Sequence, residues 1–209
     1  MSHTDKQLQI LQAAEKLFAE KGFDGTSVRD IATEADVNLA MISYYFKSKE
    51  NLMQAIFEER MDQTRIRIEN LVLDTSLEPM AKLEMLVDEY IDRIMAKQAF
   101  HKIVVCEQVI NKNPVILRLV NDLKRKNRES VQKLIRDGQN RGVFRKEVDL
   151  TLMLSVLFGT VSQMLVNKDY YREAQHLESL SDQEFDLYLR KQLSKHLKMI
   201  FKAILTHEP

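Results

Sequence analysis

Two adjacent tyrosines and a methionine lie in a run of residues without any charged side chain, Asn38 to Phe46. Asp36 precedes this run and Lys47 follows it, in a chain in which 30% of the residues are charged. Tyrosine hydroxyls can reach phosphate oxygens, and apolar groups can contact the methyl group of thymine. On an exposed helix face, such side chains would serve recognition of a nucleic acid.

Two short helices must position these side chains. Ser27 and Asp30 have the spacing of a capping box, which predicts a helix that begins at this point and extends to about Ala35. Asn38 can cap a second short helix, which continues to Phe46. Two short helices joined by a tight turn, the second with an outward face of its own, are typical of a helix-turn-helix motif.

The helical period divides the second helix into two sides. With Ile42 at the centre of the buried side, about 100° per residue places Leu39 and Phe46 near it. The same spacing predicts an outer side that holds Ala40 and Tyr44 and is bordered by Met41. For Tyr44, which lies opposite Ile42, contact with DNA is favoured over core packing. Tyr45 lies on a flank, and both interpretations stay open for it.

Lys49 lies in the first turn of the next predicted helix, which Ser48 can cap. The helix dipole disfavours a cation at this end, whereas a phosphate placed there would satisfy the backbone amides and the lysine together. An exposed lysine that contacts nothing is the alternative, at a cost of a few tenths of a kcal/mol. Taken together with the two short helices, Lys49 indicates a contact with the DNA backbone.

No arrangement of residues typical of an enzyme is evident. Glu173 and His176 form one Glu-x-x-His pair in a polar connection, whereas a di-iron bundle needs two such pairs. The five histidines are scattered, and no nucleophile elbow or Walker loop occurs. Cys106 lies beside Glu107 in an apolar stretch, where a buried, inert thiol is favoured over a redox sensor. We therefore expect no enzyme, no metal site and no cofactor.

The overall composition predicts an all-α protein with about nine helices. The 209 residues include only five glycines and three prolines, and the apolar spacing is helical nearly everywhere. The single cysteine excludes an internal disulfide and fits a reducing compartment. The N-terminus lacks the pattern of a secretory signal, so a cytoplasmic location is expected.

Residues 150–167 form an uncharged stretch of nearly membrane-spanning length. Their several hydroxyl and amide side chains, and the lack of any comparable companion segment, favour burial within protein over a membrane span. Because these residues are apolar on more than one side, we expect them to pack against a second subunit. The last helix would join this interface through an i, i+3/i+4 stripe, namely Phe185, Leu189, Leu193, Leu197, Ile200, Phe201 and Ile204.

The segment LFAEKGFDGTSVRDIATEADVNLAMISYYFKSKENL resembles the DNA-binding domain of TetR/AcrR-type transcriptional regulators. The shared features are a Gly-aromatic pair after the first helix, a Thr-Ser pair, Ile-Ala in the second helix, and an aromatic run that ends in Phe-x-Ser-Lys-Glu-x-Leu. The resemblance covers about residues 4–64, with the helix-turn-helix motif at 27–46. Residues 65–209 match only in architecture, as a helical ligand-binding and dimerisation domain.

The resemblance implies roles for individual residues. Ser27 and Arg29 would contact phosphate or a base edge at the start of the supporting helix. The residues expected to face the major groove are Leu39, Ala40, Met41 and Tyr44, and those expected to hold the DNA backbone are Tyr45 and Lys49.

Two departures from the family pattern concern the DNA-reading region. Asp36 replaces the usual turn glycine, so a left-handed conformation is expected there together with a negative charge near the DNA. Ser43 stands where many members have tyrosine. Residues 1–50 contain six Lys or Arg and eight Asp or Glu, which disfavours strong nonspecific binding. The basic run around LKRKNRESVQKLIRDGQNR is interpreted as a solvated helix face.

The resemblance also implies the biological role. It predicts a homodimeric, ligand-responsive repressor that binds a double-stranded, palindromic operator and releases it when a small-molecule effector binds after residue 65. The identity of the effector and the residues that line its pocket are not predicted. The alternative is a helical adaptor that uses residues 37–52 to bind a protein partner.

Overall fold

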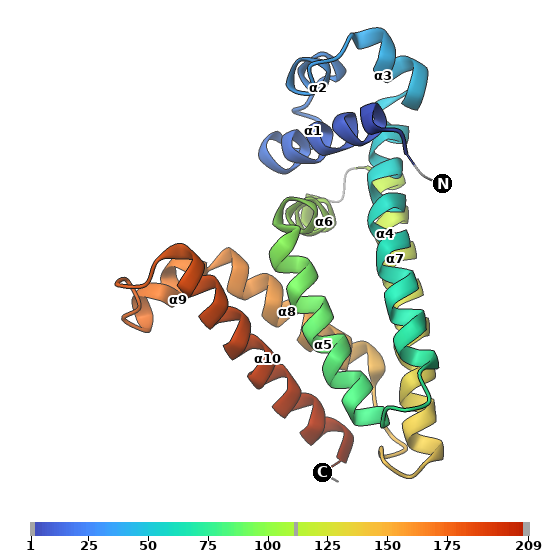
Figure 1. Ribbon diagram of the computed structural model, residues 1–209, viewed down its shortest axis with the longest axis vertical. Coiled ribbons are helices and arrows are strands. Elements are labelled where there is room, and N and C mark those ends of the chain that lie inside the picture. Colours follow the sequence, from blue (N-terminus) through green and yellow to red (C-terminus); the bar gives the residue numbers. More distant parts are fainter. Residues whose placement is uncertain (1–2, 111–112, 207–209) are drawn as a thin grey trace. The chain divides into compact units, whose positions relative to one another are not determined.

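The computed structural model describes residues 3–110 and 113–206, with the side chains of all of these except 61–67 and 110. All regular structure in this part of the chain is helical (Figure 1), as the sequence predicts. The helices are α1 (Asp5–Lys21), α2 (Val28–Glu34), α3 (Leu39–Phe46), α4 (Lys49–Leu73), α5 (Pro79–Ala96), α6 (Gln98–Ile110), α7 (Pro114–Asn140), α8 (Leu150–Val166), α9 (Lys168–Ala174) and α10 (Asp182–Thr206).

The described residues contain one helix more than expected. The additional helix is α9, which occupies part of the stretch interpreted as a polar connection. It is short and has no buried residue, so no apolar period marks it in the sequence. Arg172 near its end donates to the Leu177 carbonyl and to the Asp182 carboxylate, which ties the following loop to the start of α10.

The chain forms two compact units. Unit 1 comprises Met1–Arg67 and Lys97–Arg125, and unit 2 comprises Ile68–Ala96 and Lys126–Pro209. The long helices α4 and α7 therefore contribute to both units. The unit that contains the two short helices extends beyond the first 64 residues, because α6 and the first part of α7 belong to it.

The core of unit 1 holds α2 and α3 against the longer helices. Ile10 of α1, Ile31 of α2, Ile42 of α3 and Phe57 of α4 are almost completely buried. Ile103 of α6 belongs to the same cluster. Burial of such a side chain stabilises a fold by about 1.5–3 kcal/mol. Packing against the longer helices therefore fixes the position of α3, which is too short to be stable by itself.

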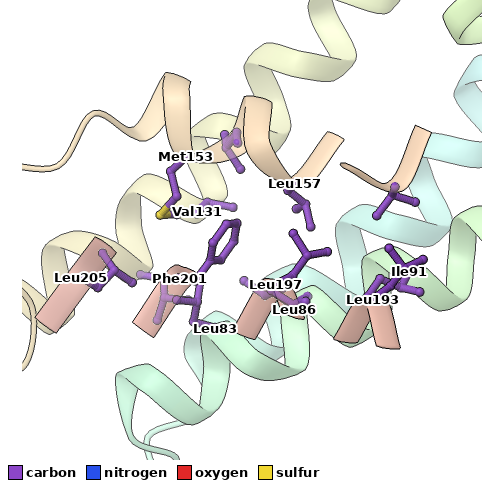
Figure 2. Close-up of a cluster of buried hydrophobic side chains, with 14 of the residues drawn as sticks. Leu83, Leu86, Ile91, Val131, Met153, Leu157, Leu193, Leu197, Phe201 and Leu205 are labelled. Atoms are coloured by element: carbon purple, nitrogen blue, oxygen red, sulfur yellow. The ribbon is translucent and has the colours of Figure 1, made fainter. Parts of the chain in front are cut away.

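The core of unit 2 is built from α5, α8 and α10 together with parts of α4 and α7 (Figure 2). Leu193, Leu197 and Phe201 of α10 are buried there beside Leu86 of α5 and Leu157 of α8. The stripe of the last helix therefore packs mainly within its own chain, and the prediction that it faces a second subunit is wrong for its buried members. A helical period identifies a buried side but not the surface that covers it.

The uncharged helix α8 is apolar on two sides, as predicted. Leu157 and Val161 lie in the core of unit 2, whereas Leu152 and Val166 are 66% and 74% exposed. Within the described residues, no single helix has the length and apolar character needed to cross a membrane; α8 and α9 reach that threshold only as a pair, bent by 78°.

Candidate nucleic-acid interface

The local sequence folds α2 and α3 through the predicted caps. The Ser27 hydroxyl accepts from the Asp30 amide at 3.1 Å, and the Asp30 carboxylate accepts from the Ser27 amide at 2.9 Å. The Ser27 hydroxyl also donates to the Asp30 carboxylate at 2.7 Å, and this bond together with that from the Ser27 amide holds the pKa of the Asp30 carboxyl below its usual value. Asn38 caps α3 by accepting from the Ala40 amide at 2.8 Å. The caps at Ser27 and Asn38 thus determine where the two short helices begin.

The outer side of α3 is exposed, as the helical period predicts. Tyr44 is 80% exposed, while Ile42 on the opposite side is 1% exposed. Ala40 is exposed and Met41 is half-buried. Leu39, which the helical period places near the buried side, is 39% exposed, because the first residue of the short helix α3 lies at its open end. The buried Ile42 side chain therefore holds α3 so that its uncharged outer side is exposed to solvent.

Tyr45 packs on the core, which is one of the two interpretations that the sequence leaves open. Its ring is half-buried and packs against the core of unit 1. The same ring contacts Tyr44 edge-on, with a centroid separation of 5.1 Å. Tyr45 therefore supports the Tyr44 ring from the protein side.

Arg29 and the turn between α2 and α3 border this surface. A shallow depression is lined by Arg29, Thr33 and Asp36 together with Ala32, Val37, Asn38 and Leu39. Arg29 is exposed. Asp36 adopts a φ of 46°, the left-handed conformation expected where the family usually has glycine. The depression thus combines one cation and one anion beside the apolar side of α3.

Lys49 has a position that the sequence did not reveal. Its ammonium donates to the carbonyl oxygens of Phe23 at 2.8 Å and Thr26 at 3.0 Å, and it lies 4.3 Å from the centroid of the Phe23 ring. The lysine therefore anchors the turn that precedes α2. An ammonium has three donors, so one remains for a phosphate. A bond between residues so far apart in the chain leaves no local signal in the sequence.

Cys106 is exposed on α6, so the prediction of a buried thiol is wrong. The apolar stretch around it covers more than one side of its helix, and only the side with Ile103 and Glu107 is buried. In the part of the chain that the structure describes, no three His, Cys, Asp or Glu side chains are grouped as metal ligands would be.

Unit 2 contains an apolar cavity that sequence patterns could not distinguish from a packed core. Its volume is about 40 Å³, so it is a small gap in the core of unit 2 rather than a large chamber. Its walls come from Leu83, Val87, Met153, Leu157 and Phe201 among others, and its polar lining residues are Glu89, Tyr90, Arg93 and Asn127.

The polar residues of this cavity lie along α5 and α7. The guanidinium carbon of Arg93 lies 5.4 Å from the centroid of the Tyr90 ring. Burial raises the pKa of the Tyr90 phenol, and the Arg93 charge opposes that rise in part. The phenol of Tyr90, the guanidinium of Arg93 and the side chains of Glu89 and Asn127 thus accompany a predominantly apolar wall.

Two family descriptions together match nearly the whole chain. "Bacterial regulatory proteins, tetR family" matches residues 10–56, and "YsiA-like protein, C-terminal region" matches residues 57–201. The first of these contains the two short helices, and the second contains α8 and most of α10.

Relatives and solved structures agree with these matches. The chain is 28% identical over 200 residues to the probable HTH-type transcriptional regulator YttP of Bacillus subtilis, covering 94% of this chain and 92% of that protein. It is 28% identical over 148 residues to the HTH-type transcriptional repressor KstR2 of Mycolicibacterium smegmatis, with 69% and 70% covered. The fold is similar to that of the transcriptional regulator FadR from Bacillus subtilis in complex with stearoyl-CoA, with a TM-score of 0.68, 20% identity, and 91% and 96% of the two chains covered.

The capped short helices and the exposed outer side of α3 agree with the match of residues 10–56 to the tetR family. These matches are to DNA-binding regulators of transcription and not to enzymes. The chain belongs to the TetR family of bacterial transcriptional regulators.

Proposed function

We propose that the chain is a cytoplasmic, ligand-responsive repressor that binds a palindromic operator as a homodimer. The observation that carries the DNA-binding part is the outer side of α3, where Tyr44 is exposed opposite the buried Ile42. The repressor role is supported by the name of the KstR2 relative. Each subunit would place its α3 in the major groove of one half-site.

The DNA contacts that we propose fall into two groups. Leu39, Ala40, Met41 and Tyr44 face the base edges, where small and apolar groups allow close approach and contact thymine methyls. Ser27, Arg29, Tyr45 and Lys49 contact the phosphate backbone and fix the orientation of α3, with Arg29 also able to reach a base edge. The Ser27 hydroxyl donates its only proton to the Asp30 carboxylate at 2.7 Å, so a contact with phosphate would need the hydroxyl to turn and donate to the phosphate oxygen instead.

The proposed dimer uses the exposed side of α8. Leu152, Ser155, Gly159, Gln163 and Val166 recur on this side at helical spacing, and all five are exposed. A glycine inside a helix costs about 1 kcal/mol relative to alanine. No atom lies within 4 Å of the position that a Cβ of Gly159 would occupy, so packing within the chain does not require this glycine. Close approach of a second helix explains it.

The proposed effector has a long or bulky apolar part. Support comes from the apolar lining of the small cavity in unit 2, which would have to widen around such a ligand, and from the stearoyl-CoA in the FadR complex and the ketosteroid transcriptional regulator KstR2 among similar structures. Such a ligand can release the operator only if it binds one arrangement of the subunits better than the other. Stearoyl-CoA and a ketosteroid are the probes, each titrated against operator affinity and melting temperature.

A gel shift with the DNA upstream of the gene, against scrambled DNA of equal length, tests the proposal. We expect a complex that persists under excess nonspecific competitor. If no specific complex forms and residues 37–52 instead bind a protein, the chain is an adaptor of the alternative kind.

A further inference from the structure

The carbonyl group of Ala35 lies where the chain leaves α2 and turns towards α3. The last carbonyl groups of a helix have no donor within the helix. That of Thr33 is satisfied inside the turn, because it accepts from the Asp36 amide at 3.2 Å. Ala35 is only 2% exposed, so water has little access to its carbonyl oxygen. This oxygen therefore needs a donor from another part of the chain.

Gln9 of α1 supplies this donor. Its side-chain amide nitrogen donates to the Ala35 carbonyl oxygen at 2.7 Å, although the two residues are 26 positions apart in the chain. The oxygen of the same amide accepts from the Lys6 ammonium at 3.1 Å. With that oxygen held by Lys6, the NH₂ group is the part of the amide that faces Ala35. Both ends of the Gln9 amide are thus bonded.

A second contact from the same side of α1 reaches the end of α2. Lys16 follows Gln9 by seven residues, or about two helical turns, and its ammonium lies 2.6 Å from the Glu34 carboxylate. The two side chains are 56% and 36% exposed, so this pair contributes little. It also joins two side chains, whereas Gln9 holds the backbone. The bond from Gln9 is therefore the contact that fixes the end of α2.

The turn after Ala35 determines where α3 begins. Only Asp36 and Val37 separate Ala35 from Asn38, which caps α3. Asp36 already has a φ of 46°, a conformation that a residue with a side chain rarely adopts. So short and constrained a connection cannot absorb a shift of its first residue. A displaced Ala35 carbonyl would therefore displace the first turn of α3 as well.

We propose that Gln9 is a positioning residue for DNA recognition, whose bond to the Ala35 carbonyl sets how α3 presents Tyr44 to the bases. The inference rests on the DNA contacts proposed above. It follows from the order of the contacts, since α1 packs against α2 and α2 against α3. Gln9 acts through the turn and is not itself assigned a contact with DNA.

The test compares Gln9→Met with Gln12→Met in the full chain, on a duplex obtained by selection. Methionine has about the length of glutamine but no N–H donor. Gln12 is exposed on the same helix and is the matched control. We expect Gln9→Met to bind the selected duplex about tenfold more weakly, an effect that the loss of a donor to a buried carbonyl can cause. Gln12→Met should bind within about twofold of the parent.

The ratio of specific to nonspecific affinity separates positioning from a loss of stability. Partial unfolding lowers both affinities by the same factor, because only the folded chain binds. A displaced α3 loses contacts with bases, whereas contacts with phosphate elsewhere remain. Gln9→Met should therefore lose most of its preference for the selected duplex over a scrambled one. Both affinities are measured well below the melting temperature of each variant.

Nuclear magnetic resonance of the DNA-free protein tests the hydrogen bond itself. In Gln9→Met, the carbonyl carbon of Ala35 should move to lower frequency, as expected when a carbonyl loses its donor. The backbone amide resonances of Leu39–Phe46 should shift with it. Neither change should occur in Gln12→Met. Because no DNA is present, this readout does not depend on the proposed DNA contacts.

A second variant covers the case that Gln9→Met does not fold. Gln9→Glu keeps the size of the side chain and the acceptor for Lys6, but its ionised carboxylate cannot donate to Ala35. Gln12→Glu is then the control for the added charge. The same loss of specificity and the same resonance shifts are expected.

A parental specificity ratio in a folded variant without the Gln9 donor would overturn the proposal. So would an equal loss of specific and nonspecific affinity, which would make Gln9 a stabilising residue only. If the parent selects no duplex, the proposed function fails, and the resonances alone decide the positioning role. Unchanged resonances of α3 in the variant without the donor would overturn that role.

Discussion

The ammonium of Lys49 lies 2.8 Å from the carbonyl oxygen of Phe23, so a residue expected only at the DNA backbone also anchors the turn before α2. A Lys49→Ala variant should therefore show two losses. Operator and nonspecific affinity should fall together, with the log–log salt slope flattened by about 0.9 through the lost phosphate contact. The melting temperature should fall as well. Titrations at several salt concentrations and thermal unfolding measure both effects.

Lys47 offers the contrast to Lys49. It is exposed at the end of α3, and among the described residues its side chain forms no hydrogen bond with the turn. Lys47→Ala should leave the melting temperature unchanged, whatever it does to the salt slope. An equal loss of thermal stability in both variants would show that the turn contacts of Lys49 do not matter.

Tyr44 and Tyr45 should respond differently to truncation. Tyr44→Ala should change the free energy of unfolding by less than about 0.5 kcal/mol, because the side chain is exposed. It should weaken the preferred site by about 1–3 kcal/mol and nonspecific DNA by less. Tyr45→Ala should lower both stability and affinity, because its ring packs on the core. Denaturant unfolding and binding titrations distinguish the two; parental operator affinity in Tyr44→Ala would refute the proposed face.

Asp36 can be tested by a matched pair of substitutions. Asn tolerates the left-handed φ of 46° about as well as Asp, whereas Gly removes the strain of that conformation, which is on the order of 1 kcal/mol. Both Asp36→Asn and Asp36→Gly remove a negative charge, so both should strengthen nonspecific DNA binding at low salt. Only Asp36→Gly should raise the free energy of unfolding noticeably. Glycine also increases the conformational entropy of the unfolded chain, which offsets part of that increase. Nonspecific affinities equal to that of the parent would place Asp36 away from DNA.

Several features of this protein were readable from local sequence. The capping box of Ser27 and Asp30 is a contact between residues three apart, and the exposure of Tyr44 follows from its angle to Ile42 on one helix. Lys49 acts on a turn that is distant in the chain, and no local pattern encodes such a contact. The apolar stripe of α10 correctly identified its buried side, but could not tell whether its own chain or a second copy covers it.

The proposed dimer is tested by a charge on the exposed side of α8. Gly159→Glu should raise the dimer dissociation constant at least about tenfold, because a buried, unpaired carboxylate is costly. Leu157 is unsuitable for this purpose, since it lies in the core of unit 2 and a charge there would disrupt the fold. Lys133→Glu, on the exposed side of α7, is the control. Light scattering across a concentration series gives the mass and hence the dimer dissociation constant. If Gly159→Glu has the same dissociation constant as the parent, this side of α8 is not in the interface.

Selection of bound duplexes from a random DNA pool tests the central claim most directly. The account predicts enrichment of one palindromic sequence by the parent, with half-site centres about one helical turn, or a multiple of it, apart. It also predicts that Tyr44→Ala, with an unchanged melting temperature, loses most of that enrichment. Recovery of no common sequence by the folded parent, or recovery of the same sequence with equal enrichment by Tyr44→Ala, would contradict the account.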